Sequence, residues 1–581
     1  MMHAVPIHSV RSSRTLVSIS PTFVREIAVV GPGIIGMPIA ALLANADLWA
    51  SDGTPARVTV VQRASKSSGW KVGAINAGRS PIGRREPALD ELVAQGAGSG
   101  RLRATTEYRD IRNADVVLVC VQTDRHAMGP DYDSLRGALH GVAESLKHRS
   151  EPSLPLVVIE STLAPSTMLT MVRDLFAEHE MEDGRDIVLA NSPSRAMPGT
   201  MVERVAAGDK LIGALSPRSA QQVACVYDRI VRTGTLHCTN SMTAEVVKTL
   251  ENAFRDVRIA YAAEVVRYCD ANDLDFFAVR RRVDARLAQE RGSKEASGGG
   301  LLVPTVGVGG HGLPKDGVLL WWRALEAGVN PAHSLILEAR RINDEAPAQV
   351  VALTERFTGS VRNREVALLG VAYRADSSDA RNSPTLVLAR HLLDRGATVR
   401  LHDPHVSAAD AHLLAAGLGG HFHRDMADAL ATAEVVIVCV AHGEYLAGGA
   451  RWLPHAQRLR TVIDACNAYR ASELATIVVR YGGIGRGIRT PSGAHIDAVV
   501  AGLGAVAQGV ANEAAMLVEL LNAHYASTAF DRVDFAEVQR LAATCFTGCE
   551  ILDPASVPPV KRLDGFRSRL VACALGASTP G

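Results

Sequence analysis

Short apolar runs alternate with amphipathic stretches over the first half of the chain. Glu26 to Val30 is an apolar run that leads into a glycine-rich turn, and Met37 to Ala46 then has the pattern of a helix. Arg57 to Val61 and Ala114 to Thr123 are further apolar runs, the second of them unbroken over most of its length. Runs of this kind predict strands of a parallel sheet that is buried on both faces.

The pattern then predicts two further strands and a change of architecture. Leu156 to Glu160 and Ile187 to Ala190 are apolar runs of strand length, and we expect the strands to stop there. From Met242 to about Cys269 the apolar residues recur at helical spacing, which predicts one long helix.

A second α/β unit follows this helical region. Its four expected strands are Glu365 to Leu369, Thr398 to His402, Val435 to Val440 and Val462 to Ala465. From Ile488 to the end the chain is rich in Ala, Val and Leu at helical spacing, which predicts a helical extension.

A glycine fingerprint connects the first strand to the first helix. It reads Gly31-Pro32-Gly33-Ile34-Ile35-Gly36 and has the flanking strand and helix that a dinucleotide-binding turn requires. The first glycine makes the tight turn, the second lets the backbone approach a pyrophosphate, and the third lets the helix pack on the strand. We therefore expect a dinucleotide at the N-terminus of this helix.

The strand from Arg57 to Val61 leaves the choice of dinucleotide open. An acidic residue at its end would hold the ribose of NAD, but the strand ends in Gln62 and Arg63. Arg63 could meet the 2′-phosphate of NADP. Alternatively, Gln62 bonds to the ribose of NAD and Arg63 is a solvated surface charge.

Further candidate cofactor residues lie where strands of the first sheet end. Ligands of open α/β sheets bind at the carboxyl ends of the strands. The residues at these ends are Val121, Thr123, Glu160, Ser161 and Thr162.

These elements predict an α/β protein with two Rossmann-like, doubly wound domains, a central long helix and a C-terminal helical extension. A chain of 581 residues is too long for one core. The expected parts are a disordered tail over 1–22, a cofactor domain over 23–235, a central helical domain over 236–344, a second Rossmann-like domain over 345–487 and the extension over 488–581.

The composition narrows the classes of partner. Lys and Arg number 62 against 61 Asp and Glu, so no basic field would hold nucleic acid or a membrane surface. No apolar run approaches the ~20 residues of a membrane helix. The nine cysteines are scattered, which favours reduced thiols in a cytoplasm, and Cys545 and Cys549 lack the neighbours of a metal site. No metal is expected.

The stretch from Val308 to Asp316 is the most unusual loop of the chain. It reads Val-Gly-Gly-His-Gly-Leu-Pro-Lys-Asp. Its glycines and proline predict a turn or a close approach of the backbone to something else. Taken alone, the stretch would be only a loop.

The motifs together resemble the UDP-glucose/GDP-mannose dehydrogenase family over roughly Arg25 to Gly487. The resemblance implies two Rossmann-like domains, NAD in the first, a nucleoside or nucleotide sugar as substrate, and a homodimer. The matching stretches are the Gly31 fingerprint, Trp70-Lys71 to Ile75-Asn76, Pro81-Ile82 to Glu86-Pro87, Glu160-Ser161-Thr162, Leu250 to Val257, Gly309 to Asp316, Arg341 to Asp344, Gly370 to Arg374 and Tyr481 to Gly487.

The resemblance also assigns the catalytic residues and reveals two losses. The family's loop cysteine, which carries the aldehyde through a second oxidation, falls at Gly312, and its Asn-Pro-Glu reads Ser192-Pro193-Ser194. Without a thiolate, covalent catalysis cannot start from position 312. The residues that serve the first hydride transfer in the family are kept: Lys248, Asn252, Asp316 and Thr123. His311 is a further candidate for moving the proton. The expected substrate-binding residues are Ser194, Arg195, Lys248, Asn252, Gly310, Gly312, Lys315 and Arg381.

Three functions fit this pattern of loss and retention. In the favoured one, the enzyme oxidises the sugar transiently and returns the hydride, as a dehydratase or epimerase with no net NADH. In the second, it is a two-electron dehydrogenase that releases an aldehyde or ketone with NADH. In the third, it is a catalytically silent relative that only binds.

Overall fold

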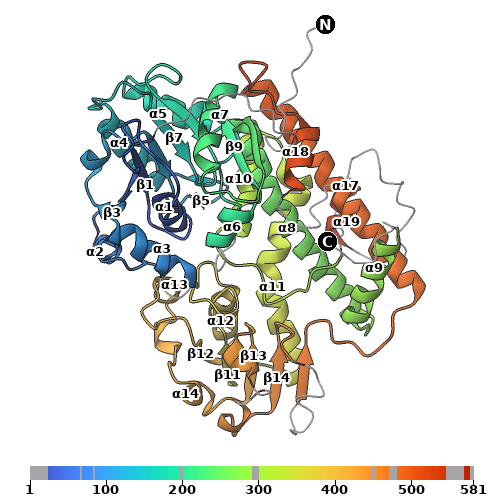
Figure 1. Cartoon of the computed structure of the whole chain (residues 1–581). Helices are drawn as coiled ribbons and strands as arrows, with labels where there is room; N and C mark the ends of the chain where they lie inside the picture. The colour runs from blue at the N-terminus through green and yellow to red at the C-terminus, as the bar shows by residue number, and fades with distance from the viewer. Residues whose placement is uncertain are drawn as a thin grey trace. The chain divides into compact units, whose positions relative to one another are not determined.

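The computed structural model of the chain describes most of its residues (Figure 1). The predicted tail, Cys545 and Cys549 lie outside the described part. The described ranges are 24–65, 68–82, 86–195, 201–290, 300–447, 450, 452–469, 480–544 and 568–575. The chain forms two compact units, the first made of Met1–Glu251, Leu319–Val329 and Ala514–Phe546, the second of Asn252–Val318, Asn330–Glu513 and Thr547–Gly581.

The first unit contains an eight-stranded sheet in the order β10-β9-β8-β7-β4-β1-β2-β3. All neighbours pair in parallel except β8 and β9. The expectation that strands stop after β8 is wrong, because β9 and β10 extend the sheet. The bounds are β1 Glu26–Val30, β2 Arg57–Val61, β3 Leu102–Thr105, β4 Val116–Val119, β7 Leu156–Ile159, β8 Val188–Asn191, β9 Lys210–Ala214 and β10 Leu236–Asn240.

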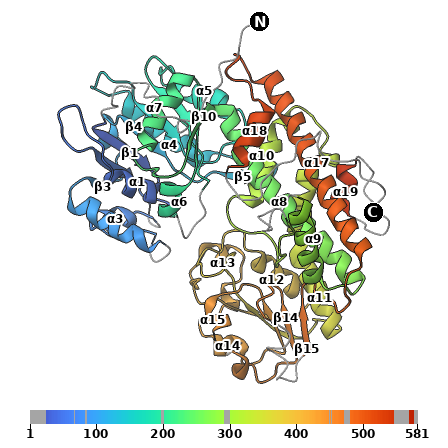
Figure 2. The same ribbon diagram turned by 45° about the vertical axis from the view of Figure 1, so that its right-hand side comes forward.

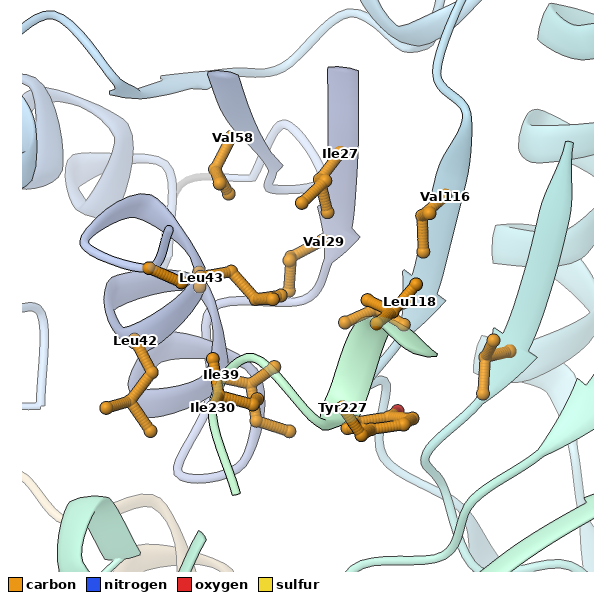
Figure 3. Close-up of a cluster of buried hydrophobic side chains, with 14 of the residues drawn as sticks. Ile27, Val29, Ile39, Leu42, Leu43, Val58, Val116, Leu118, Tyr227 and Ile230 are labelled. Carbon is orange, nitrogen blue, oxygen red and sulfur yellow. The ribbon is translucent and has the colours of Figure 1, made fainter. Parts of the chain in front are cut away.

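Helices cover both faces of this sheet because alternate strand residues point to opposite sides. Ile27 and Val29 of β1 face one core with Val58, Leu118 and the helices α1, α3, α6 and α7 (Figure 3). Ala28 and Val30 face the other core with α4 and α5. The bounds are α1 Gly36–Ala44, α2 Trp70–Asn76, α3 Pro87–Gly98, α4 Asp133–Leu146, α5 Arg173–Glu178, α6 Met201–Ala207 and α7 Pro217–Tyr227.

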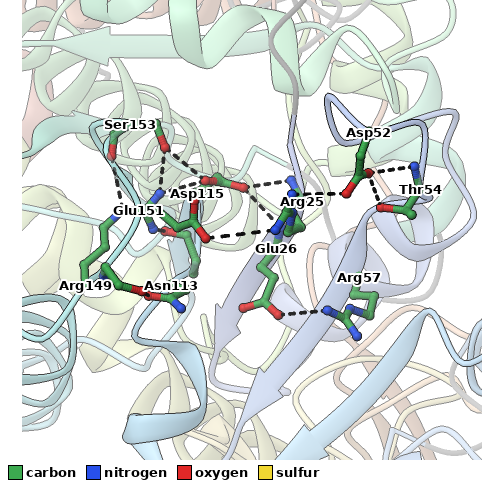
Figure 4. A network of polar contacts seen from close by, with 12 residues as sticks. Arg25, Glu26, Asp52, Thr54, Arg57, Asn113, Asp115, Arg149, Glu151 and Ser153 are labelled. Carbon is green, nitrogen blue, oxygen red and sulfur yellow. Dashed lines mark hydrogen bonds and ion pairs between the residues drawn. The ribbon is translucent and has the colours of Figure 1, made fainter.

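Polar side chains secure the edge of this sheet at which β1 and β4 begin (Figure 4). Asp115, just before β4, accepts hydrogen bonds from the backbone amides of Arg25 and Glu26, at 2.7 and 3.2 Å. Arg149 donates to the same carboxylate at 2.7 Å. These contacts fix the start of the strands, far from the ends at which a ligand is expected.

The second unit contains the second sheet, in the order β12-β11-β13-β14-β15 with parallel pairing throughout. Figure 2 labels its strands β14 and β15. The four predicted strands are confirmed, and β15 is one that the pattern did not predict. The bounds are β11 Glu365–Leu369, β12 Thr398–His402, β13 Val435–Val438, β14 Thr461–Asp464 and β15 Arg480–Gly483, with helices α12 Pro384–Asp394, α13 Ala411–Ala415, α14 Met426–Leu430 and α15 Gly443–Leu446.

Long helices make up the central region. The predicted helix is α8, which spans Ser241–Ala271. It is followed by α9 Phe276–Glu290, α10 Leu313–Glu326 and α11 Leu335–Thr358. Part of the glycine-rich loop is therefore helical, because Leu313 to Asp316 form the first turn of α10.

The extension is helical, as predicted, and consists of α17 Gly493–His524, α18 Phe535–Ala542 and α19 Arg569–Ala574. By length and composition alone, α17 is long and apolar enough to cross a membrane, a property that core helices of soluble proteins share. Part of α17 packs on its own chain. Within the second unit, Tyr261 of α8 donates to the carbonyl oxygen of Val499 at 2.7 Å, and Glu513 accepts from the backbone amide of Leu335 at the start of α11 at 2.9 Å.

Candidate active site

The glycine turn of the first unit has the shape of an anion-binding turn. Gly31 has a φ of +98° and lies so close to β4 that an added Cβ would stand 2.8 Å from the carbonyl oxygen of Cys120. An added Cβ at Gly33 would meet nothing within 4 Å, so space is open above this residue. No side chain caps the N-terminus of α1 at Ile35. Because uncapped amides and open space meet here, the turn fits a dinucleotide pyrophosphate.

The predicted residues at the strand ends lie beside one another. The hydroxyl of Thr123 donates to the carbonyl oxygen of Thr162 at 2.8 Å. The hydroxyl of Ser161 donates to the carbonyl oxygen of Val121 at 2.6 Å. The loops after β4 and β7 are thus tied together at the carboxyl end of the sheet.

Glu160 lies beneath these loops in a buried network that the sequence did not indicate. Lys210 at the start of β9 donates to both carboxylate oxygens at 2.8 Å and to the carbonyl oxygen of Ser192 at 3.0 Å. The hydroxyl of Tyr227 also donates to Glu160. Burial and the neighbouring Glu160 raise the pKa of Tyr227, so the phenol keeps its proton. A lysine that opens an apolar strand was the signal that could have revealed Lys210.

Gln62 and Arg63 follow β2, as expected. The Gln62 amide donates to the carbonyl oxygen of Arg63 and to the hydroxyl of Ser68, both at 3.0 Å. The side chain of Arg63 is exposed.

The second unit contains Asn252 and Asp316, which the family resemblance predicts to be catalytic. The Asn252 amide donates to Asp316 at 2.5 Å, and Lys315 donates to the other carboxylate oxygen at 2.9 Å. Asp316 is fully buried and Lys315 is 2% exposed. Lys315 is therefore the partner of the predicted catalytic acid, Asp316.

Gly312 lies directly beside this pair. An added Cβ would stand 2.8 Å from the Asn252 amide nitrogen and 3.6 Å from Asp316 Oδ2, and the backbone of Gly312 is not in the left-handed region. Glycine is therefore not demanded by conformation at this position.

The loop before Gly312 is held by the segment that contains Arg381. The Gly310 amide donates to the carbonyl oxygen of Arg381, and the Asn382 amide donates to the carbonyl oxygen of Gly310, both at 2.9 Å. The Arg381 guanidinium pairs with Asp379 at 2.6 Å. The main chain of Arg381 thus shapes the loop, while its side chain has a protein partner.

The remaining predicted residues have different surroundings. Lys248 lies one turn before Asn252 on α8 and makes no hydrogen bond or ion pair with the described residues. Arg195 is buried and pairs with Glu251. Ser194 and His311 are partly exposed.

Three models of one family match the chain in succession. They are the NAD binding domain of the UDP-glucose/GDP-mannose dehydrogenase family at residues 25–231, its central domain at 242–345 and its UDP binding domain at 367–471. The extension lies beyond these matches.

Individual relatives agree with this assignment. The chain is 30% identical over 466 residues to a UDP-N-acetyl-D-mannosamine dehydrogenase of Pyrococcus horikoshii, covering 80% of this chain and 99% of that protein. It is 31% identical over 463 residues to an NDP-N-acetyl-D-galactosaminuronic acid dehydrogenase of Ralstonia solanacearum, covering 78% and 98%. The crystal structure of an NDP-N-acetyl-D-galactosaminuronic acid dehydrogenase from Methanosarcina mazei Go1 matches with a TM-score of 0.66 and 29% identity, covering 80% and 96%.

These relatives overturn the favoured functional prediction. They are named as dehydrogenases, which pass the hydride to NAD and release NADH, so an enzyme that returns the hydride without net NADH is contradicted. The dehydratase and epimerase interpretations were wrong because they inferred a change of reaction from the residues lost at Gly312 and Ser194, whereas the relatives are named as dehydrogenases. The chain belongs to the UDP-glucose/GDP-mannose dehydrogenase family and is an NAD-dependent oxidoreductase.

Proposed function

We propose that the chain is a dehydrogenase that oxidises a hydroxyl-bearing carbon of a nucleotide sugar and releases NADH. The observation that carries this proposal is the hydrogen bond of 2.5 Å between Asn252 and Asp316 beside Gly312. Asn252 provides a hydrogen-bond donor and Asp316 a buried carboxyl group that could act on the hydroxyl of the sugar. Bound NAD accepts a hydride in this chemistry.

The roles of the protein groups follow from their chemistry. Asp316 takes the hydroxyl proton, directly or through water, as the carbon loses hydride. The Asn252 amide and the Lys248 ammonium stabilise the charge that develops on the sugar oxygen. Thr123 orders the loop on the cofactor side through Thr162. One C–H and one O–H bond break, a carbonyl forms, and one proton is released with NADH.

We propose that oxidation stops at the carbonyl. A second oxidation through a covalent intermediate needs a thiolate near the carbonyl carbon, and Gly312 has no side chain. Ser194 stands where the resemblance expects the glutamate that assists hydrolysis. The product is therefore an aldehyde or ketone, and two electrons are transferred.

We propose a UDP-linked N-acetylhexosamine as substrate. Two relatives are named as a UDP-N-acetyl-D-mannosamine dehydrogenase and an NDP-N-acetyl-D-galactosaminuronic acid dehydrogenase. The family model at 367–471 is a UDP binding domain. The candidate sugar contacts are Ser194, Lys248, Asn252, Gly310, Gly312, Lys315 and Arg381.

A panel assay tests this function. The protein is incubated with NAD and UDP-N-acetyl-D-mannosamine, UDP-N-acetyl-D-glucosamine, UDP-N-acetyl-D-galactosamine or UDP-glucose, and NADH is followed by its absorbance at about 340 nm. We expect NADH with at least one N-acetylated sugar. Binding of NAD and sugar without any NADH would favour the catalytically silent alternative.

The homodimer and the cytoplasmic location stay predictions. Light scattering on the purified chain at several concentrations measures the mass and tests the dimer. Fractionation of the source cells tests the location.

A further inference from the structure

The extension contacts the loop after β8, which the resemblance places near the sugar. Arg195, the last described residue of this loop, is 5% exposed at its side chain. It donates to the carbonyl oxygen of Leu541 at 2.9 Å and to the hydroxyl of Thr544 at 3.0 Å. Leu541 lies in the last turn of α18, and Thr544 follows that helix. Both contacts lie within the first unit.

The other side of the Arg195 guanidinium faces α8. Its Nε donates to Glu251 at 3.3 Å, and its Nη2 donates to the second oxygen of the same carboxylate. Glu251 is 1% exposed at its side chain and immediately precedes Asn252. The Arg195 guanidinium thus pairs with the Glu251 carboxylate on one side and with the C-terminal end of α18 on the other, both favourable for a cation.

Helix α18 is itself anchored firmly on the first unit. The Asn240 amide at the end of β10 donates to the carbonyl oxygen of Arg532 at 2.9 Å. Asn522 exchanges two hydrogen bonds with the backbone of Val533, at 2.9 and 2.8 Å. The side chains of Val538 and Leu541 are 0% and 1% exposed. The helix can therefore serve as a fixed support for Arg195.

The base of the same loop is tied to the cofactor side. Lys210 donates to the carbonyl oxygen of Ser192, and the Ser192 hydroxyl donates to that of Leu211 at 2.7 Å. The Ser194 amide donates to the carbonyl oxygen of Glu160 at 3.3 Å. The loop from Ser192 to Arg195 is thus held at Ser192, at the backbone amide of Ser194 and at the side chain of Arg195.

We propose that α18 is a built-in clamp that fixes this loop for the sugar, and that Arg195 is a positioning residue rather than a substrate ligand. The proposal rests on the proposed function for its kinetic consequence. It gives the extension, which lies beyond the matched family domains, a task in catalysis. It also explains why the side chain of Arg195, in a loop that the resemblance places near the sugar, is buried against other protein groups.

Hydrogen exchange tests the clamp without any substrate. Arg195→Lys keeps the charge but cannot reach both supports at once, and Thr544→Val removes one acceptor at nearly constant volume. We expect amide exchange over 192–195 to rise about tenfold in the first variant and about threefold in the second. Arg540→Gln, which changes an exposed residue of the same helix, should leave it unchanged. Unchanged exchange in Arg195→Lys would overturn the clamp.

Kinetics with UDP-N-acetyl-D-mannosamine, or another sugar that is turned over, test the consequence. We expect KM to rise about tenfold in Arg195→Lys and about threefold in Thr544→Val, with kcat nearly constant and NAD affinity unchanged. Thr544→Val is decisive because a direct ligand role for Arg195 predicts no effect of this variant. Exchange that rises while KM stays constant would contradict positioning. If the wild type turns over no sugar, the proposed function fails, while the exchange result still decides the clamp.

Discussion

The glycine turns that follow β1 and β11 have nearly the same backbone but different contents. Gly31 and Gly370 have φ values of +98° and +100°. Each donates its amide across to the end of the neighbouring strand at 2.9 Å, Gly31 to Val61 and Gly370 to His402. In the first turn a helix starts five residues later, at Gly36, whereas in the second the next helix starts only at Pro384.

Asp403 fills the second turn. Its carboxylate accepts from the backbone amides of Val371 and Ala372 at 2.7 and 2.8 Å, and from His442 Nε2 at 3.0 Å. The other ring nitrogen of His442 accepts from the Asp376 amide at 2.9 Å, which leaves the proton on Nε2. The residue that corresponds to Asp403 in the first turn is Gln62, which bonds elsewhere.

The comparison indicates that a Rossmann-like turn can bind an external anion only when no side-chain carboxylate of the protein already accepts its backbone amides. In the first turn the amides and the space above Gly33 are open to a pyrophosphate. In the second the protein's own carboxylate takes the place of that ligand. We therefore expect this second turn not to hold a dinucleotide pyrophosphate.

The largest expected effect is on stability when the carboxylate is removed. Asp403→Ala leaves buried amides and His442 without their acceptor, so we expect a loss of about 4 kcal/mol in the free energy of unfolding. Urea denaturation measures it. The control Asp410→Ala removes a partly exposed helix cap at α13 and should cost only about 1 kcal/mol. Equal losses in the two variants would contradict the internal-anion interpretation.

Acid should weaken the second turn in a defined pH window. Burial alone would raise the pKa of Asp403, but hydrogen bonds from His442 and backbone amides outweigh it and lower the pKa to about 2. Because this value lies below the usual 3.8, the charged form stabilises the fold above pH ~4, and about 2 kcal/mol is lost as the pH falls towards ~2. Denaturation of wild type and Asp403→Asn between pH 7 and 2 checks this. A stability difference that does not shrink in acid would be inconsistent with it.

A substitution in the first turn, at Gly33, should lower the affinity for NAD rather than the stability of the fold. Gly33→Ala adds a methyl group to space that only the cofactor needs, so we expect NAD to bind about tenfold more weakly, or about 1.4 kcal/mol. Isothermal titration calorimetry measures the affinity. Gly137→Ala, in helix α4 and equally unobstructed, is the matched control and should bind NAD normally. Normal affinity in Gly33→Ala would place the pyrophosphate elsewhere.

The smallest effect on stability is expected at Gly312, a glycine that the backbone does not require. A Cβ there has only to displace the end of the Asn252 side chain, so Gly312→Cys should change the unfolding free energy by less than about 1 kcal/mol. We expect the thiolate to permit a second oxidation and raise the NADH released per sugar from about one to about two. Gly312→Ser, without a thiolate, should stay at the lower value. If Cys and Ser behave alike, the missing thiol is not what stops the reaction.

The sequence predicted the strands best where apolar runs were unbroken. Glu26 to Val30, Arg57 to Val61, Glu365 to Leu369 and Thr398 to His402 are strands with the predicted bounds. Strands β9 and β10 were missed because Lys210 opens one and His237, Thr239 and Asn240 interrupt the other. Their polar residues are satisfied by partners distant in the chain, which local patterns do not reveal.

The site was predictable only in its local parts. The residues of the glycine turn, and Lys315 and Asp316, are contiguous in sequence, so their chemistry could be predicted from the sequence. The Lys210 partner of Glu160 and the α18 partner of Arg195 are 50 and about 346 residues away along the chain. Contacts between residues this far apart along the chain depend on the tertiary structure, which local sequence patterns do not reveal. The functional prediction failed where it inferred a different reaction from two lost side chains, those expected at Gly312 and Ser194.

The most direct test measures NADH and product mass in one reaction. A limiting amount of UDP-N-acetylhexosamine is converted to completion with excess NAD, and a carbonyl trap removes the product. We predict about one NADH per sugar and a product lighter by two hydrogens before trapping. About two NADH with an acid product, or conversion of the sugar with no NADH, would contradict the account.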